Sequence, residues 1–198
     1  MKNGSLEVIT GGMFAGKSEE LIRRLRRHIF AKQQVIVFKS KLDTRYNPKS
    51  IVTHNNSCLD AIAIQDISDF YIPEIKTRLD TSQIVGFDEV QFFPYQIVEF
   101  ILELRRRGKI IIASGLDLDY KIEPFEVTKE LLSHANKINK YHAVCVKCFN
   151  EALFSYRLTK EKRQILVGGL NDYLPLCEQC YLKAMTDIDF CQNLSYNK

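Results

Sequence analysis

The sequence reads Gly11-Gly12-Met13-Phe14-Ala15-Gly16-Lys17-Ser18 between an apolar stretch at 6–10 and an amphipathic stretch at 19–32. This run fits the pattern G-x-x-x-x-G-K-[ST], in the expected order of strand, loop and helix. Glycines let such a loop fold tightly, so that its N–H groups and the helix N-terminus face phosphate oxygens. Lys17 is expected to reach the β- and γ-phosphates, and Ser18 to offer its hydroxyl to Mg²⁺. The run therefore predicts a nucleoside triphosphate site.

One further sequence motif bears on which base the nucleotide carries. GTP-binding proteins of this class read guanine with Asn-Lys-x-Asp, and the similar run Asn136-Lys137-Ile138-Asn139 lacks the aspartate. We therefore expect ATP, or a loose preference among triphosphates.

The chain around this loop alternates between two patterns. Further apolar stretches suited to strands occur at 35–39, 61–64, 84–87 and 110–114, and helical patterns occur at 67–79 and 94–107. This alternation favours an α/β fold with a parallel central sheet covered on both faces. From Tyr141 the pattern changes to short strands, cysteine pairs and a Gly-Gly turn. We predict a nucleotide-binding domain at 1–140, a small domain at 141–192 and a tail at 193–198.

Two adjacent carboxylates, Asp88 and Glu89, follow the apolar stretch 84–87. An acidic residue at the end of such a strand occupies the Walker B position, near Mg²⁺. Glu89 should point past the phosphates. It could polarise water, as in ATPases, or accept the proton of an acceptor hydroxyl, as in small-molecule kinases. The motif alone leaves both open.

An acceptor pocket is suggested by the residues that leave the same edge of the sheet. Gln91 and Phe92 follow the carboxylates, and the loop 115–125 carries Leu116, Tyr120 and Phe125. Ligands bind at the carboxyl edge of such sheets, and these side chains suit a flat, mostly apolar ring. Ordinary core packing is the alternative for each of them.

The small domain contains two Cys-x-x-Cys pairs, Cys145 with Cys148 and Cys177 with Cys180, separated by the 28 residues 149–176. Four thiolates at about 2.3 Å are the ligands of a closed, structural Zn²⁺ site. Redox pairs are the alternative, but neither pair lies in a thioredoxin-like setting. The intervening segment includes Val167-Gly168-Gly169-Leu170-Asn171-Asp172-Tyr173, which could close over a substrate.

Composition sets wider limits. The 198 residues suffice for one core plus a small module, and 45% are hydrophobic while 26% are charged. The net charge of +4 fits an anionic small substrate or a weak nucleic-acid binder. No apolar run approaches the roughly 18 residues of a membrane span, and residues 1–4 do not resemble a secretory signal. We expect a cytoplasmic protein without a membrane partner.

Taken together, these residues resemble the type II thymidine kinase family over about 6–190. The motifs that carry the resemblance are residues 11–18, Leu42-Asp43-Thr44-Arg45-Tyr46, Asp88-Glu89-Val90-Gln91-Phe92-Phe93, 115–125, the cysteine pairs and 167–173. The resemblance implies a RecA-like P-loop domain and a zinc-ribbon domain. A long loop of the zinc-ribbon domain, called the lasso in this family, covers the substrate. It implies transfer of the γ-phosphate of ATP to the 5′-hydroxyl of thymidine, and also of deoxyuridine. A homotetramer, inhibited by thymidine triphosphate, is implied as well.

The resemblance also implies a role for each matching residue. Glu89 is the general base, Lys17 and Ser18 bind phosphate and Mg²⁺, and Asp88 is the Walker B carboxylate. The nucleotide side further includes Asp43, Arg45 and Gln91. The nucleoside side comprises Met13, Phe92, Leu116, Tyr120, Phe125, Val167, Gly168, Gly169 and Tyr173, with lasso backbone groups holding the base edges. The sequence departs from many members at Gly12, where they have proline, and from some at Tyr120, where they have phenylalanine.

A different function remains possible at this point, namely a P-loop ATPase whose zinc ribbon binds nucleic acid. Glu89 would then activate water, and DNA or RNA would stimulate ATP turnover. The sequence has no stripe of interleaved aromatic and basic residues, which counts against a nucleic-acid partner.

Overall fold

A computed structural model describes residues 3–43, 50–52 and 58–186. Its main sheet consists of parallel strands in the order β5 (Ile62–Ile64), β2 (Val35–Ser40), β6 (Ile84–Asp88), β7 (Ile110–Gly115), β1 (Ser5–Gly11) and β8 (Lys137–Tyr141). The inner strands are mainly apolar because both of their faces are covered, and every residue of β6 is buried. The predicted α/β class with a parallel central sheet is confirmed.

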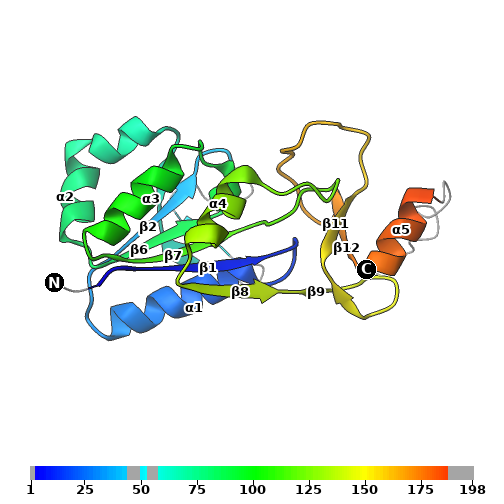
Figure 1. Ribbon diagram of the computed structural model, residues 1–198, viewed down its shortest axis with the longest axis horizontal. Helices are drawn as coiled ribbons and strands as arrows, with labels where there is room; N and C mark the ends of the chain where they lie inside the picture. Colours follow the sequence, from blue (N-terminus) through cyan, green and yellow to red (C-terminus); the bar gives the residue numbers. More distant parts are fainter. Residues whose placement is uncertain (1–2, 44–49, 53–57, 187–198) are drawn as a thin grey trace.

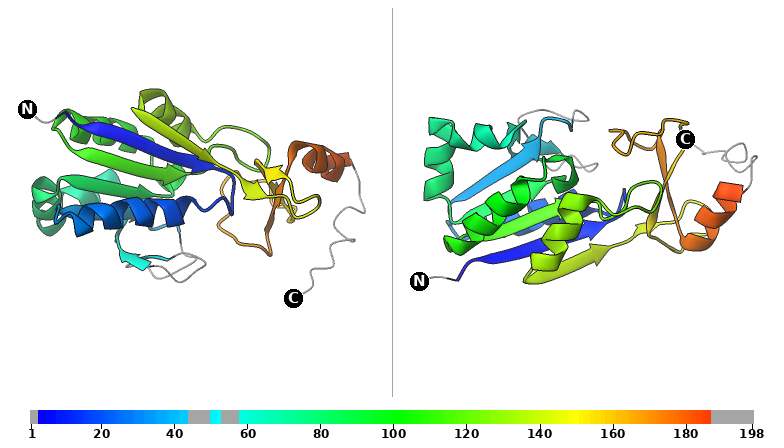
Figure 2. Two further views of the ribbon diagram at one scale, coloured as in Figure 1. Left: turned by 90° about the horizontal axis from the view of Figure 1, so that it is seen from below. Right: turned by 45° about the horizontal axis from the view of Figure 1, so that its top comes forward.

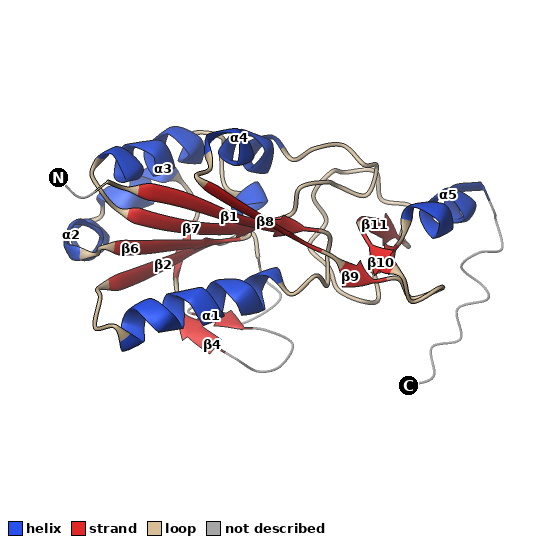
Figure 3. Ribbon diagram, turned by 60° about the horizontal axis from the view of Figure 1, so that its bottom comes forward, coloured by secondary structure: helices blue, strands red, loops and turns tan. Residues whose placement is uncertain are grey.

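Helices cover the two faces of this sheet (Figures 1 and 3). On one face lies α1 (Lys17–Phe30), whose Leu21 and Leu25 share an apolar cluster with strand residues. On the other lie α3 (Ile97–Arg106) and α4 (Glu126–His134), which contribute to the largest cluster. Smaller elements complete this part: β3 (Ser50–Val52), β4 (Cys58–Asp60), η1 (Ile67–Tyr71), α2 (Pro73–Thr81) and η2 (Val90–Phe92).

Several boundaries differ from the sequence-based expectation. The helical pattern at 67–79 is divided into η1 and α2, because Pro73 begins a new helix at a position that needs no N–H donor. The helix expected from 94 begins at Ile97, after a turn in which Ile97 N donates to Pro94 O at 2.9 Å. The sequence reading also missed α4 and β8. The strand β8 is polar and largely exposed at the sheet edge, so it lacks the apolar run of an inner strand.

The chain continues directly from β8 into a smaller unit beyond the carboxyl edge of the sheet (Figure 2). This unit contains β9 (Ala143–Val144), β10 (Glu151–Ala152), β11 (Phe154–Arg157), β12 (Tyr173–Leu176) and α5 (Glu178–Thr186). It has its own apolar cluster, which also includes Ala15 of the phosphate loop. Residues 158–172, which connect β11 to β12, are called the lasso below. The predicted tail at 193–198 lies outside the described residues.

Within the described ranges, no helix has the length and apolar character needed to cross a membrane.

Candidate active site and metal centre

A cleft of about 280 Å³ lies where the carboxyl ends of the strands face the lasso. Residues of the phosphate loop, the strand ends, the loop after β7 and the lasso all line it. Of the residues predicted from the sequence, the cleft is lined by Met13, Phe14, Gly16, Lys17, Ser18, Asp43, Asp88, Glu89, Phe92, Leu116, Tyr120, Phe125, Val167, Gly168, Gly169 and Tyr173. Gly11, Gly12, Ala15 and Gln91 do not line it, and Arg45 lies outside the described residues. The two predicted halves of the site therefore form one cavity.

The phosphate loop has a conformation that favours glycine at two positions. Gly11 has φ 136°, and a Cβ there would lie 2.0 Å from the carbonyl oxygen of Tyr141 in the neighbouring strand. Gly16, with φ 74°, precedes the first turn of α1. The ammonium of Lys17 donates to the carbonyl of Gly12 at 2.7 Å and is largely buried. The loop thus surrounds a fixed positive charge at a helix N-terminus, an arrangement suited to phosphate.

Asp88 lies at the end of β6, beside the start of α1. The hydroxyl of Ser18 donates to its two oxygens at 3.1 and 3.2 Å, and that of Ser114, at the end of β7, donates to the first of them. Burial raises the pKa of Asp88 to about 6, aided by the negative charges of Glu89 and Asp43 and opposed by the two hydroxyls. The carboxylates of Asp43, Asp88 and Glu89, which line the same cavity, could hold a hard divalent cation, which would favour their ionised forms.

Glu89 is held in place by backbone and side-chain contacts. Its backbone is left-handed, with φ 53°, and its side chain is buried. Gln91 Nε2 donates to Glu89 Oε2 at 2.5 Å, while Gln91 Oε1 accepts from Leu116 N at 3.0 Å. Gln91 therefore contacts Glu89 from outside the cleft and links it to the loop after β7. The role on the nucleotide side that the sequence predicts for Gln91 stays a prediction.

The other end of the cleft is mainly apolar. Phe92, Phe125 and Tyr173 are buried, and they line the cleft together with Met13 and Leu116. These side chains could surround a planar ring. The apolar lining begins beside Glu89, so a ring bound there would bring its substituents near that carboxylate.

Other residues that line the cleft were missed by the sequence reading: Glu19, Ile51, Leu118, Asp119, Ser155, Arg157, Gln164, Ile165 and Leu166. Two of them, Ser155 and Arg157, are buried and alternate along β11. Ser155 Oγ accepts from Met13 N at 3.0 Å, which joins β11 to the phosphate loop. Polar residues at alternate positions of a short strand were the available signal, but nothing local indicated which face of β11 is buried.

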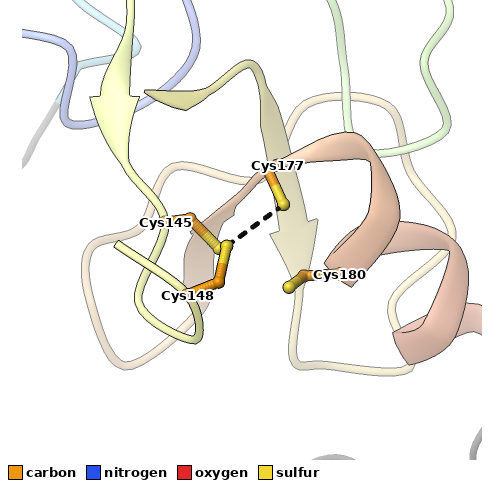
Figure 4. A group of neighbouring side chains, drawn as sticks. All are labelled: Cys145, Cys148, Cys177 and Cys180. Carbon is orange, nitrogen blue, oxygen red and sulfur yellow. Dashed lines mark hydrogen bonds between the residues drawn. The ribbon is translucent and has the colours of Figure 1, made fainter. Parts of the chain in front are cut away.

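The four predicted cysteine ligands form one cluster (Figure 4). Their sulfur atoms all lie within 4.8 Å of one another, and those of Cys148 and Cys177 are 3.5 Å apart. A tetrahedral Zn²⁺ with bonds of about 2.3 Å would place its sulfurs about 3.8 Å apart, so the arrangement fits this ion.

The thiols of this cluster differ in how readily they ionise. Burial raises the pKa of Cys145, but hydrogen bonds from the N–H groups of Cys177, Cys148 and Lys147 outweigh it and lower the pKa to about 6. Burial and the neighbouring thiols raise the pKa of Cys180 to about 12. A metal ion would supply the positive charge that four adjacent thiolates need.

Comparison with known proteins identifies the family of the chain. The family model described as thymidine kinase matches residues 4–181. A thymidine kinase of Bacteroides thetaiotaomicron is 39% identical over 92% of this chain and 89% of its own, and one of Porphyromonas gingivalis is 38% identical over 93% and 88%. Among solved structures, domain III of the replication initiation protein DnaA from Thermotoga maritima has a TM-score of 0.44 and 15% identity over 69% of this chain and 54% of its own, too distant to bear on function. The chain belongs to the thymidine kinase family.

Proposed function

We propose that this protein transfers the γ-phosphate of ATP to the 5′-hydroxyl of thymidine. The observation that carries this proposal is the single cleft in which a phosphate loop and the carboxylates of Asp43, Asp88 and Glu89 meet an apolar, aromatic pocket. Glu89 lines the cavity that these two halves share. The relatives reported above support thymidine as the acceptor, since they are named thymidine kinases.

In the proposed reaction the 5′-oxygen bonds to the γ-phosphorus as the bond to the β-phosphate oxygen breaks, giving ADP and thymidine 5′-monophosphate. Glu89 accepts the hydroxyl proton. Lys17 and the N–H groups of the loop bind the phosphates, and Ser18 and Asp88 would hold Mg²⁺, which offsets the charge of the triphosphate. Because phosphoryl transfer needs little covalent help, positioning and electrostatics supply most of the catalysis.

The nucleoside would lie with its ring among Met13, Phe92, Leu116, Tyr120, Phe125 and Tyr173. Backbone groups of Val167, Gly168 and Gly169 would bind the edges of the base. Zn²⁺ on the four cysteines would have a structural role, because four thiolates leave no open coordination position. It would fix the base of the unit that carries the lasso.

The family resemblance supports the remaining parts of the proposal. We expect deoxyuridine to be a second acceptor, thymidine triphosphate to inhibit, Arg45 to act beside Asp43, and the protein to be a cytoplasmic homotetramer. The separate apolar cluster, in which Ala15 is joined by residues after 141, supports a division into domains at 1–140 and 141–192.

The test is ATP consumption by the purified protein with Mg²⁺, measured alone, with thymidine and with single-stranded DNA. We expect turnover only with thymidine, with its 5′-monophosphate and ADP formed in equal amounts. Turnover that requires DNA and ignores thymidine would instead assign Glu89 to water and reject the proposal.

A further inference from the structure

The lasso leaves and rejoins the protein at one pair of residues. Arg157, the last residue of β11, is paired with Tyr173, the first residue of β12. Just beyond this pair, Leu158 N donates to Asp172 O at 2.8 Å. Residues 159–165 of the lasso are mostly exposed, so apolar burial contributes little to the shape of this segment.

The side chain of Arg157 is bonded to several points along the lasso. Its Nη1 donates to Glu161 O at 3.0 Å and also to Arg163 O, and its Nη2 donates to Gln164 O at 2.9 Å. Nη2 and Nε donate to the hydroxyl of Tyr173 at 2.6 and 3.0 Å. These five bonds use all five N–H donors of a guanidinium. Arg157 lines the cleft, yet no donor is left for a substrate.

The surroundings of this cation are neutral and well matched to it. Arg157 is only 6% exposed, and its five hydrogen bonds go to three carbonyl oxygens and to one hydroxyl that accepts twice. Its guanidinium carbon lies 3.7 Å from the centre of the Tyr120 ring, close enough for a cation–π contact. A lysine could not reproduce this arrangement, because it has three donors at a single point.

The same cluster reaches the base-binding residues. The hydroxyl of Tyr120 donates to Lys162 O at 3.0 Å, and that of Tyr173 donates to Leu166 O at 2.8 Å. Leu166 directly precedes Val167, Gly168 and Gly169. Contacts to Arg157 therefore connect the loop after β7, the start of β12 and the part of the lasso that borders the cleft.

We propose that Arg157 is a positioning residue that holds the lasso in its nucleoside-binding shape before substrate arrives. It acts through the carbonyls of residues 161, 163 and 164 and through the rings of Tyr120 and Tyr173. Preorganisation of this kind lowers the cost of ordering the loop on binding, so it affects nucleoside affinity rather than phosphoryl transfer. The kinetic part of this inference rests on the proposed function, but the structural part does not.

The test is the substitution Arg157→Lys, read out by trypsin cleavage and by kinetics. Lys160, Lys162 and Arg163 are exposed trypsin sites within the lasso. We expect cleavage there to become about tenfold faster, and the KM for thymidine to rise about tenfold or more, because several charge-assisted bonds are lost. The kcat, the KM for ATP and the bound zinc should stay close to the wild-type values. Lys160→Arg, which alters an exposed lysine of the same loop and keeps the trypsin site, should change none of these.

A second variant, Tyr173→Phe, removes the hydroxyl that accepts from Arg157 and donates to Leu166. It should also speed lasso cleavage and raise the KM for thymidine, by a smaller factor than Arg157→Lys. Unchanged cleavage in both variants would overturn the inference, and so would an equal loss of kcat and of affinity for both substrates. If the wild-type protein ignored thymidine, the proposed function would fail while trypsin still tested the lasso.

Discussion

On the phosphate side of the cleft, the functional side chains stand at the ends of buried strands. On the lasso side, the functional side chains lie on a loop or next to one. Asp88 ends a strand in which every residue is buried, and Lys17 begins a helix packed on the sheet. The lasso instead depends on the polar contacts of Arg157 and on the cysteine cluster at the base of its unit.

The two sides of the cleft therefore obtain their shapes in different ways. The shape of the phosphate side follows from folding of the apolar core, so it is set together with the stability of the main domain. The shape of the lasso side follows from a few directional contacts that can be removed individually. We therefore expect substitutions near Glu89 to change the rate of the chemical step, and substitutions that release the lasso to change nucleoside affinity.

The largest effect is expected for Glu89→Gln, which tests the phosphate side alone. A general base contributes a factor of up to about 10⁴, so kcat should fall about a thousandfold. ATP affinity should be nearly unchanged, because the phosphate loop keeps its contacts. Both are measured by steady-state kinetics and by equilibrium binding of ATP.

The control for this prediction is Glu126→Gln, which makes the same chemical change on the exposed surface of α4 and should leave kcat unaltered. An unchanged kcat in Glu89→Gln would remove this residue as the base and would weaken the division between the two sides.

The phosphate side is also the part that could be predicted best from sequence. A loop of eight consecutive residues and one apolar strand ending in Asp88-Glu89 carry the information locally, and the structure places Lys17, Ser18, Asp88 and Glu89 around one cavity. The cysteine pairs were equally clear, because each is a local pattern and zinc chemistry requires both.

The contacts that shape the lasso side could not be found in this way. The sequence around Arg157 does not distinguish it from an ordinary surface arginine. Its role depends on the fold, which places residues 161–164, Tyr120 and Tyr173 around it. The contacts of Gln91 could not be predicted for a similar reason, since its partner Leu116 is 25 residues away in the sequence. The strand β8 was missed because an edge strand needs no apolar run.

The next largest effect is expected for Cys177→Ser, which tests the lasso side. A closed site that loses one thiolate should lose its zinc, and the unit that carries the lasso should lose its support. We expect the KM for thymidine to rise about a hundredfold while ATP still binds, because binding of structural zinc contributes to folding. Zinc content, ATP binding and thymidine KM are measured on the same preparation.

Cys58→Ser is the matched control, because Cys58 is exposed in β4 and lies outside the cluster. Normal thymidine affinity in a zinc-free Cys177→Ser protein would show that the lasso side does not need the metal. Loss of ATP binding in the same variant would show instead that the two sides are not separable. The explanation would then be that Ala15 of the phosphate loop packs in the apolar cluster of the small unit.

The smallest effect, and the sharpest test of the boundary between the sides, is expected for Gln91→Leu. Gln91 bonds Glu89 on one side and the N–H of Leu116 on the other, so it joins the base to the loop that carries Tyr120. Leucine removes both bonds while keeping a similar volume. Because Gln91 does not line the cleft, we expect kcat to fall about tenfold, as a misoriented base would produce, with both KM values nearly unchanged. Gln96→Leu, at an exposed glutamine before α3, should leave kcat as it is. If the KM for thymidine rose in Gln91→Leu while kcat held, then Gln91 would serve the nucleoside pocket through Leu116. Gln91 would then belong to the lasso side of the cleft, and only Glu89 would belong to the phosphate side.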